Sequence, residues 1–443
     1  MQDTLTSNIK IQDQVTVCFI GGHHSGKSSM ASSVLVNCTG PNNFNQRSQV
    51  KIQKDYEDYF ARPSKEPNEW LKCGFDTLKT EKERNRTLKM KFKYLHGNGY
   101  GLNLVDTPSG DYDYHIAKAI AYSDYAVLAV PANIAVEHLS AEDLAHATIA
   151  YGLGIRSLIV AITKMDMIKF SDAVYNQICA EVASRLEVIG YSKSSITFLP
   201  FSLVCYKTAE LKTSPLNWHT GKSLSEIMTN LKVPLRLIDM PFRMMIFEIY
   251  KIGGIGTIVL GKVVSGSLLA GRFVGPLDYD CPGETNTIEY AYDNMTYASA
   301  GDVVGINIRN LRIPYQNKRM KMISLINPDL VRPVSELVAI IDVLNYPFNL
   351  HAGASCRLDA NGQSSGCRIK QIINQLDRHS NITLVDPPRL QAGSTYTVIL
   401  QMLKPVYVEV HDDYGRLGMF VVVESKAVIG YGVVKEITKY HGY

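Results

Sequence analysis

A short glycine-rich segment near the amino terminus carries residue types that bind phosphate. Residues 21–28 read GGHHSGKS and fit the spacing G-x-x-x-x-G-K-[ST]. Glycines let successive backbone N–H groups point inward, which makes a concave anion site at the start of a helix. Lys27 would reach the β- and γ-phosphates of a nucleotide, and the Ser28 hydroxyl would hold Mg²⁺. The segment predicts a phosphate site but does not separate a kinase from an ATPase or a GTPase.

The surrounding residues supply the strand and helix that such a loop needs. Residues 15–20 form an apolar, strand-like run, and MASSVLVN follows the loop with a helix-like pattern. From residue 15 to about residue 231, apolar strands alternate with longer helical patterns, which is typical of a parallel sheet wrapped by helices. The expected strands of this part are residues 15–20, 102–107, 125–130, 157–163 and 196–201. The polar, turn-rich segment 37–78 is expected to be an elaborated surface loop.

The spacing of apolar residues changes after about residue 235. Strand-like runs broken by glycine, aspartate and asparagine turns replace the helical spacing, which predicts an all-β unit, and a second such unit begins near residue 334. We therefore expect a multidomain fold, with an α/β P-loop domain over residues 1–235. Two β-barrel domains would follow, domain II over 236–332 and domain III over 333–443.

Composition limits the class of protein. The chain has 443 residues, of which 46% are hydrophobic and 20% charged, and a formal net charge of +4. This balance is typical of a globular protein with two to four domains. The eight cysteines form no CxxC pair, which argues against a zinc site or a disulfide framework. No signal-like start or apolar run of membrane length occurs, so we expect a cytosolic protein without membrane contact.

Four further segments follow the loop in the order that a GTPase requires. Thr87, within the charged stretch LKTEKERNRTLKM, is a candidate for binding Mg²⁺ and sensing the γ-phosphate. Asp106 begins a DTP segment at the end of an apolar strand and would support the metal, usually through a water.

The remaining two segments address the base. TKMD, residues 163–166, follows another apolar strand, and Asp166 there would accept hydrogen bonds from the guanine N1–H and exocyclic amine. The Lys164 stem would cover one face of the base, and a backbone N–H at Ser202 or Leu203 would meet the guanine O6. Because each segment ends a strand of an open sheet, the set predicts a guanine-nucleotide site.

With these motifs in place, the chain resembles the translational GTPases of the elongation factor 1-alpha group. That group includes the eukaryotic class-II release factor and the ribosome-rescue GTPase that partners Pelota-type proteins. The resemblance rests on GGHHSGKSS, DTP, TKMD, YKIGGIGTIVLGKVVSG and GRLGMFVVVESKAVIGYGVV. It implies a G domain followed by two β-barrels, with GTP or GDP and Mg²⁺ as cofactors. The implied metal-binding residues are Ser28, Thr87 and Asp106. The expected nucleotide-binding residues are Gly21, Gly22, His23, His24, Ser25, Gly26, Lys27, Ser28, Ser29, Asp106, Thr107, Pro108, Ser109, Gly110, Thr163, Lys164, Met165, Asp166, Ser202 and Leu203.

Three positions depart from the family pattern. His24 stands where the family has an aspartate, so we do not expect a monovalent-cation or water contact that the aspartate would make there. Thr163 stands where the family has an asparagine and keeps part of its hydrogen bonding, so we expect weaker nucleotide affinity. After DTP the family has Gly-His, whose imidazole positions the attacking water, whereas this chain has Ser109 and Gly110. Neither residue can polarise water as imidazole does, so hydrolysis is expected to be slow and no catalytic residue is assigned.

Two classes of function follow from the resemblance. The first is a GTPase that delivers aminoacyl-tRNA, or a release- or rescue-type protein of similar shape, to the ribosome, with an exchange factor as a further partner. The second is a nucleotide-bound scaffold with little turnover. A P-loop kinase or metabolic ATPase is disfavoured because it would explain neither TKMD nor the barrels. Lys318, Arg319 and Lys321 could meet RNA phosphates, although solvated surface charge is the favoured interpretation.

Overall fold

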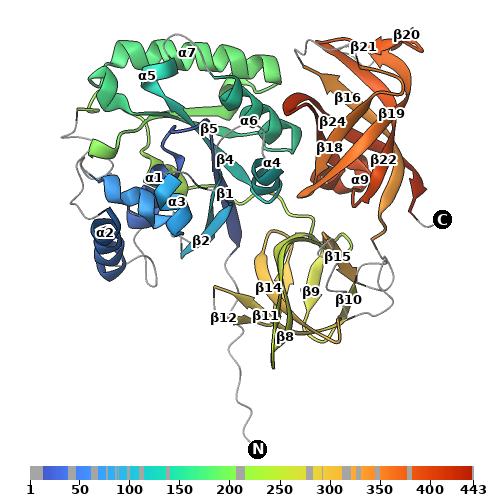
Figure 1. Ribbon diagram of the computed structural model, residues 1–443, viewed down its shortest axis with the longest axis horizontal. Coiled ribbons are helices and arrows are strands. Elements are labelled where there is room, and N and C mark those ends of the chain that lie inside the picture. Colours follow the sequence, from blue (N-terminus) through green and yellow to red (C-terminus); the bar gives the residue numbers. More distant parts are fainter. Residues whose placement is uncertain are drawn as a thin grey trace, which may run out of the picture.

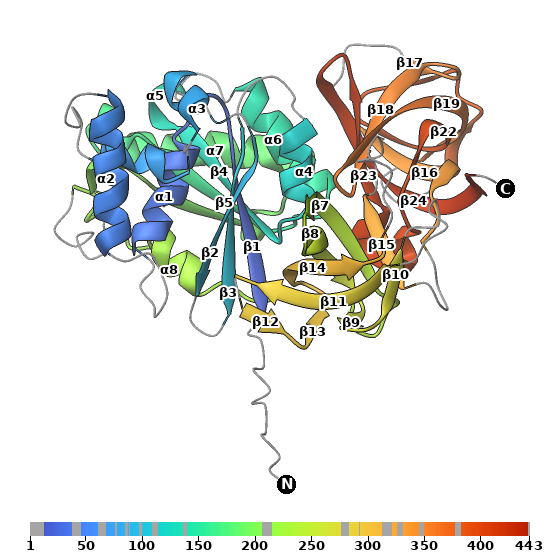
Figure 2. The ribbon, with the colours of Figure 1, turned by 60° about the horizontal axis from the view of Figure 1, so that its bottom comes forward.

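The structure is a computed structural model. It describes residues 13–37, 46–60, 68–75, 78–84, 87, 89–96, 100–108, 114–135, 140–205, 215–275, 283–291, 293–311, 321–325, 331–344, 350–376 and 382–441. Figures 1 and 2 show an α/β unit followed by two β-barrels, which confirms the expected fold class. We call the α/β unit the G domain, the barrel of strands β7 to β15 barrel II, and the barrel of strands β16 to β24 barrel III.

The G domain is built on a six-stranded sheet in the order β2-β3-β1-β4-β5-β6, in which β2 alone runs antiparallel to its neighbour. Its strands are β1 (Gln14–Ile20), β2 (Lys91–His96), β3 (Gly101–Asp106), β4 (Tyr125–Pro131), β5 (Leu158–Thr163) and β6 (Ile196–Pro200). Its α-helices are α1 (Lys27–Asn37), α2 (Gln46–Phe60), α3 (Lys79–Arg84), α4 (Tyr114–Ala121), α5 (Ala132–Ala135), α6 (Ala141–Gly152), α7 (Asp172–Ile189) and α8 (Leu224–Thr229).

Alternating residues of the central strands bury both faces of this sheet. In β1, Val17 and Phe19 pack with helices α1 and α8, whereas Cys18 and Ile20 pack with α4, α6 and α7. All seven residues of β1 are buried, as expected for a parallel strand covered on both sides. Packing on both faces thus fixes where the loops at the carboxyl ends of the sheet begin.

One expectation from the sequence was wrong. The segment 37–78 is not simply a surface loop, because it contains the 15-residue helix α2 and the short 3-10 helix η1 (Glu69–Gly74). Tyr56 of α2 is fully buried, and Ile52, one turn earlier, packs against the same core. This helix is held by the apolar pair at i and i+4, which the many polar residues around it conceal.

Each barrel is closed by six strands, since β10 pairs with β11 in barrel II and β18 pairs with β19 in barrel III. Barrel II comprises β7 (Arg243–Ile252), β8 (Gly256–Ser265), β9 (Ser267–Leu269), β10 (Phe273–Gly275), β11 (Gly283–Tyr290), β12 (Asp293–Met295), β13 (Tyr297–Ser299), β14 (Val303–Arg309) and β15 (Met322–Leu325). Barrel III comprises β16 (Val334–Val343), β17 (Leu350–His351), β18 (Ser355–Ala360), β19 (Gln363–Leu376), β20 (Ile382–Val385), β21 (Arg389–Leu390), β22 (Ser394–Val406), β23 (Met419–Glu424) and β24 (Ala427–Tyr440), with the short helix α9 (His411–Tyr414).

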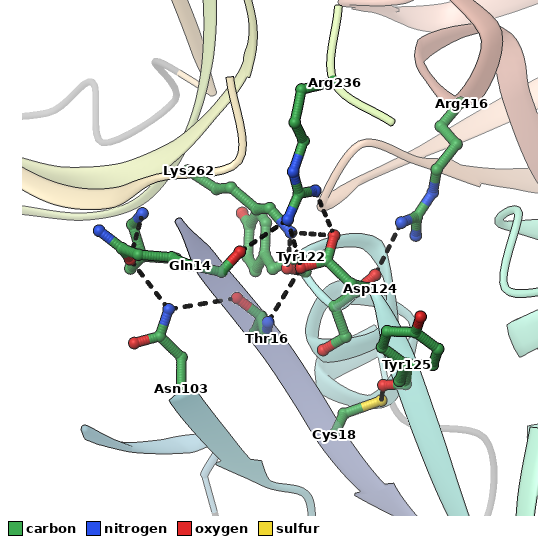
Figure 3. A network of polar contacts seen from close by, with 12 residues as sticks. Gln14, Thr16, Cys18, Asn103, Tyr122, Asp124, Tyr125, Arg236, Lys262 and Arg416 are labelled. Carbon is green, nitrogen blue, oxygen red and sulfur yellow. Dashed lines mark hydrogen bonds and ion pairs between the residues drawn. The ribbon is translucent and has the colours of Figure 1, made fainter. Parts of the chain in front are cut away.

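Both barrels dock on the G domain through a polar cluster centred on Asp124, shown in Figure 3. The Asp124 carboxylate accepts hydrogen bonds from Arg236 at 2.7 and 3.2 Å and from Lys262 of β8 at 2.8 Å. Arg416, which follows α9, donates to the Ser123 carbonyl at 2.7 Å and to the Leu153 carbonyl at 2.9 Å. Because Asp124 precedes β4, the cluster lies at the amino end of the sheet, opposite the phosphate loop.

Barrels II and III also contact each other directly. Arg243 of β7 is 2% exposed and donates to the Glu409 carboxylate at 2.8 Å, and its guanidinium lies 5.4 Å from the centre of the Tyr414 ring. Each of the three units therefore contacts both of the others.

Candidate nucleotide site

The loop between β1 and α1 has the backbone shape that its glycines permit. Gly21 has φ +132° and Gly26 has φ +93°, and both values lie in the region that side chains with a Cβ rarely adopt. A Cβ on Gly21 would also come within 2.5 Å of the Ala129 carbonyl oxygen of β4. His24 occupies the left-handed region with φ +56°, a conformation in which His, Asn and Asp are enriched. The family aspartate and this histidine therefore suit the same backbone.

Lys27 is folded back onto the loop. It is only 5% exposed, and its ammonium group donates to the Gly21 carbonyl at 2.8 Å and to the Gly22 carbonyl at 2.7 Å. The loop carbonyls thus fix a buried cation at the entrance of α1, where a phosphate would gain both its charge and the helix N-terminus.

Three predicted metal ligands converge although they come from distant parts of the chain. The Ser28 hydroxyl lies 3.0 Å from the Thr87 hydroxyl, which donates to the Asp106 carboxylate at 3.3 Å. Neighbouring ligands of an octahedral Mg²⁺ at ~2.1 Å are separated by about 3 Å, so the oxygen set fits this ion. In the described part of the chain, no three His, Cys, Asp or Glu side chains gather as they would around zinc.

The predicted base-binding residues also come together. Lys164 has φ +56°, which turns the chain sharply after β5 and leaves Asp166 exposed. The Ser202 hydroxyl, beyond β6, donates to the Asp166 carboxylate and so orients it. The backbone N–H of Met165 donates to the Phe201 carbonyl at 3.3 Å, which ties the two segments together, and the Leu203 carbonyl accepts from the Asn68 amide at 2.8 Å.

Thr163 connects the base segment with the phosphate loop. It is 2% exposed, and its hydroxyl donates to the Ser25 carbonyl at 2.7 Å. The side-chain amide of the family asparagine would also offer a hydrogen-bond donor here. Thr163, which replaces that asparagine, therefore keeps a hydrogen bond between the base segment and the phosphate loop.

Thr107 and Pro108 are buried beneath this edge, and the Thr107 hydroxyl donates to the Phe19 carbonyl at 2.6 Å. The Thr107 side chain thus holds β3 against β1. Ser109 and Gly110, where the family histidine is missing, lie outside the described residues.

Helix α6 supplies contacts that the sequence reasoning missed. His146 Nδ1 accepts from the Gly21 N–H at 3.0 Å, the Asp143 carboxylate accepts from the Gly22 N–H at 2.6 Å, and the Glu142 carboxylate accepts from the His23 N–H at 3.1 Å. Burial lowers the pKa of His146 to about 3, so this imidazole is neutral and accepts as the geometry requires. Burial also raises the pKa of Asp143, while its bonds and Lys27 oppose that shift. The sequence does show the three polar residues at the spacing E-D-x-x-H on one helix. Nothing in that spacing indicated that they bind the backbone of the phosphate loop.

Comparison with known proteins places this geometry in a family. Residues 12–243, more than half of the chain, match the family model of the elongation factor Tu GTP binding domain. The chain belongs to the elongation factor Tu family of translational GTPases. Residues 336–435 match the model described as GTP-eEF1A C-terminal domain-like.

Relatives of this family align along nearly the whole chain. Elongation factor 1-alpha of Mucor circinelloides f. lusitanicus is 28% identical over 97% of this chain and 96% of its own length. Among solved structures, the GTP-bound GTPase-like domain of S. cerevisiae Ski7 superposes with a TM-score of 0.76 at 16% identity, covering 96% of this chain and 97% of that one. Elongation factor SelB from Methanococcus maripaludis gives 0.67 at 17% identity, covering 97% and 80%. The structural likenesses establish the shared fold, and the sequence matches establish a GTP- or GDP-binding GTPase.

No helix among the described residues is long and apolar enough to cross a membrane.

Proposed function

We propose that this chain is a GTP-dependent translation factor that brings a cargo to the ribosome in the cytosol. The cargo is aminoacyl-tRNA or a release- or rescue-type protein of similar shape. The observation that carries the proposal is the convergence of Ser28, Thr87 and Asp106 beside the phosphate loop, in a chain that also holds two docked barrels. This is the arrangement by which a GTPase couples its γ-phosphate to the position of other domains.

Different residues of the site would bind the phosphates, the guanine base and the metal ion. The loop amides and Lys27 take the phosphates, Asp166 and Lys164 take guanine, and Ser28, Thr87 and Asp106 hold Mg²⁺. When bound, the ion neutralises charge on the β- and γ-phosphates. Since Thr87 bonds to both other ligands, a change in its position would also shift the Ser28 and Asp106 oxygens that would hold the ion.

Hydrolysis is proposed to be slow. The family histidine is replaced by Ser109 or Gly110 in the sequence. His146 cannot substitute for it, since it is buried, has a pKa of about 3 and is engaged by the Gly21 amide. Without an imidazole to orient water, the GTP state would last longer than in an ordinary elongation factor.

Barrel II has a pocket that is a candidate for binding part of the cargo. A pocket of about 200 Å³ lies between barrel II and β2, and its described lining is largely apolar and aromatic. Its lining includes Tyr94, Ile258, Leu260, Glu289, Tyr290 and Asn307. Elongation factors of the group that this chain resembles use the second domain to hold the amino acid, so we propose that the pocket takes an apolar group of the cargo.

Lys321, one of three basic residues considered for RNA contact, is partly buried, and burial lowers its pKa. Lys318 and Arg319 lie outside the described residues. Lys321 therefore adds no support for RNA contact.

The second candidate is a GTP-bound scaffold with incidental turnover, which the Ser109–Gly110 sequence favours. One experiment addresses both candidates. The tagged chain, loaded with GTP or GDP and Mg²⁺, would be passed through a ribosome-containing extract, and bound RNA and protein would be identified. A Lys27→Ala variant, which cannot grip phosphate, is the control.

We expect ribosomes together with tRNA, or with a protein of the release or rescue class, to be retained by the GTP form and lost from the GDP form and the variant. Retention that does not depend on the nucleotide would favour the scaffold. Absence of ribosomes in every arm would refute the proposed function.

A further inference from the structure

A cavity of about 290 Å³ lies where the G domain and both barrels meet. Four charged side chains line it: Asp124 from the G domain, Arg236 from the connection to barrel II, Lys262 from barrel II and Arg416 from barrel III. Residues 234–237 form part of its wall, and Leu237 there is 38% exposed. The cavity is separate from the nucleotide site, since Asp124 lies at the opposite end of the sheet.

The carboxylate of the cavity is already fully engaged. Asp124 accepts from the Thr16 N–H at 2.9 Å, twice from Arg236 and once from Lys262. Four accepted bonds use the lone-pair positions that a carboxylate has. Burial lowers the pKa of Arg236, but the charges of Asp124, Asp302 and Asp13 outweigh it and raise the pKa. Asp124 therefore has no capacity left for another cation.

Arg416 makes no ion pair among the described residues, although the charge of Asp124 acts favourably on it from a distance. It donates to the carbonyls of Ile120, Ser123 and Leu153, at 3.3, 2.7 and 2.9 Å. No carboxylate within the described ranges lies within ion-pair distance of it. Since a guanidinium has five N–H groups, about two remain after these three bonds. Burial lowers the pKa of Arg416, and the charge of Arg236 acts in the same direction, whereas Asp124 opposes the shift.

Lys262 has Asp124 as its counter-charge but keeps donor capacity. It is 4% exposed and donates to the Tyr122 carbonyl at 2.9 Å and to Asp124. An ammonium group has three N–H donors, so about one is left without a partner among the described residues. Burial lowers the pKa of Lys262 to about 8, and the charges of Arg236 and Arg416 act in the same direction. Buried charges normally acquire a counter-charge, and the cavity offers room for one.

We propose that this cavity binds a small oxyanion of the phosphate class, held by Arg416 and Lys262. Guanidinium and ammonium donors match the oxygens of a tetrahedral anion through charge-assisted hydrogen bonds. Because the two donors belong to different barrels and their other bonds reach the G domain, the bound anion favours the docked arrangement of all three units. This inference is independent of the proposed cargo and of GTP hydrolysis.

The test uses inorganic phosphate titrated calorimetrically into the full-length chain saturated with a non-hydrolysable GTP analogue and Mg²⁺, at constant ionic strength set with chloride. The triphosphate of the analogue occupies the β- and γ-phosphate positions at Lys27, so added phosphate cannot enter the loop. The informative variant is Leu237→Glu, which places a competing carboxylate at the cavity wall without removing a native hydrogen-bonding side chain. Leu237→Gln is the matched neutral control, and GDP affinity reports whether either variant disturbs the G domain.

We expect one saturable phosphate site in the wild type, competed by sulfate and not by acetate. Leu237→Glu should weaken phosphate binding by about tenfold or more, and Leu237→Gln should change it by less than about twofold. Thermal unfolding should rank the three proteins as phosphate affinity does. Phosphate should raise Tm by similar amounts in the wild type and in Leu237→Gln, and by less in Leu237→Glu.

Absence of a saturable site in the wild type would overturn the proposal. So would phosphate binding of equal strength in the Glu and Gln variants.

Discussion

The bond between Thr163 and the phosphate loop offers a sharp test of how the two halves of the nucleotide site cooperate. Thr163→Val keeps the shape of the side chain and removes the donor. The Ser25 carbonyl, in a residue that is 0% exposed, then loses its partner at 2.7 Å. Leaving a buried acceptor unpaired costs about 1–3 kcal/mol. Because this bond positions the loop for phosphate, we expect most of that cost to appear as weaker nucleotide binding.

At 1.4 kcal/mol per factor of ten, the expected loss of affinity is about 5- to 100-fold. It should be the same factor for GDP and GTP, because the bond lies away from the γ-phosphate. Equilibrium titration with fluorescent GDP and GTP analogues measures both affinities. Thr163→Ser, which keeps the hydroxyl, is the matched control and should stay within about threefold of wild type.

Wild-type affinity in Thr163→Val would refute the coupling. An equal loss in the serine variant would show that packing of the methyl group, rather than the hydrogen bond, carries the effect.

Further predictions concern the base, the metal, the domain junction and pH. Asp166→Asn should shift preference from GTP toward XTP by about tenfold or more, since an amide can donate to the xanthine O2; competition binding checks this. Thr87→Ala should weaken Mg²⁺-dependent GTP binding more than GDP binding, whereas Thr87→Ser should not, as measured by titration at several Mg²⁺ concentrations. Asp124→Asn, with Asp239→Asn as the exposed control, should lower the free energy of unfolding by about 3 kcal/mol in urea melts, because it leaves Arg236 and Lys262 without their counter-charge. Burial raises the pKa of Asp302 to about 6, so the folded state holds its proton more tightly than the unfolded state and loses stability as pH rises from about 4 to 6. Asp302→Asn should remove up to about 3 kcal/mol of this loss, so its advantage over wild type in urea melts should be larger at pH 7 than at pH 4.

Local sequence was sufficient for the parts of the site that lie within one strand–turn–helix unit. The loop from Gly21 to Ser28 follows β1 directly, so its glycine positions and its lysine could be assigned without a structure. The convergence of Asp106 with Ser28 could also be expected, because the parallel strands β1 and β3 bring their carboxyl ends to one edge. Thr87 reaches the same edge because β2, the strand after it, runs antiparallel and begins there, opposite Asp106.

Contacts between distant and individually ordinary residues could not be predicted. His146 lies 125 positions from Gly21, and a histidine on an apolar helix is usually a core residue. The cluster around Asp124 joins residues from all three units, each of which reads as common surface charge in the sequence. The helix α2 was missed because its two anchoring residues, Ile52 and Tyr56, are surrounded by polar side chains.

The most direct test of the central claim is single-turnover hydrolysis of GTP by the Mg²⁺-loaded chain, with and without ribosomes. Elongation factor 1-alpha should be measured in parallel under the same conditions. We predict that the chain binds GTP stably and that ribosomes accelerate its hydrolysis far less than that of the elongation factor, because Ser109 and Gly110 stand where the family histidine would be. A ribosome-stimulated rate equal to that of the elongation factor would contradict this account.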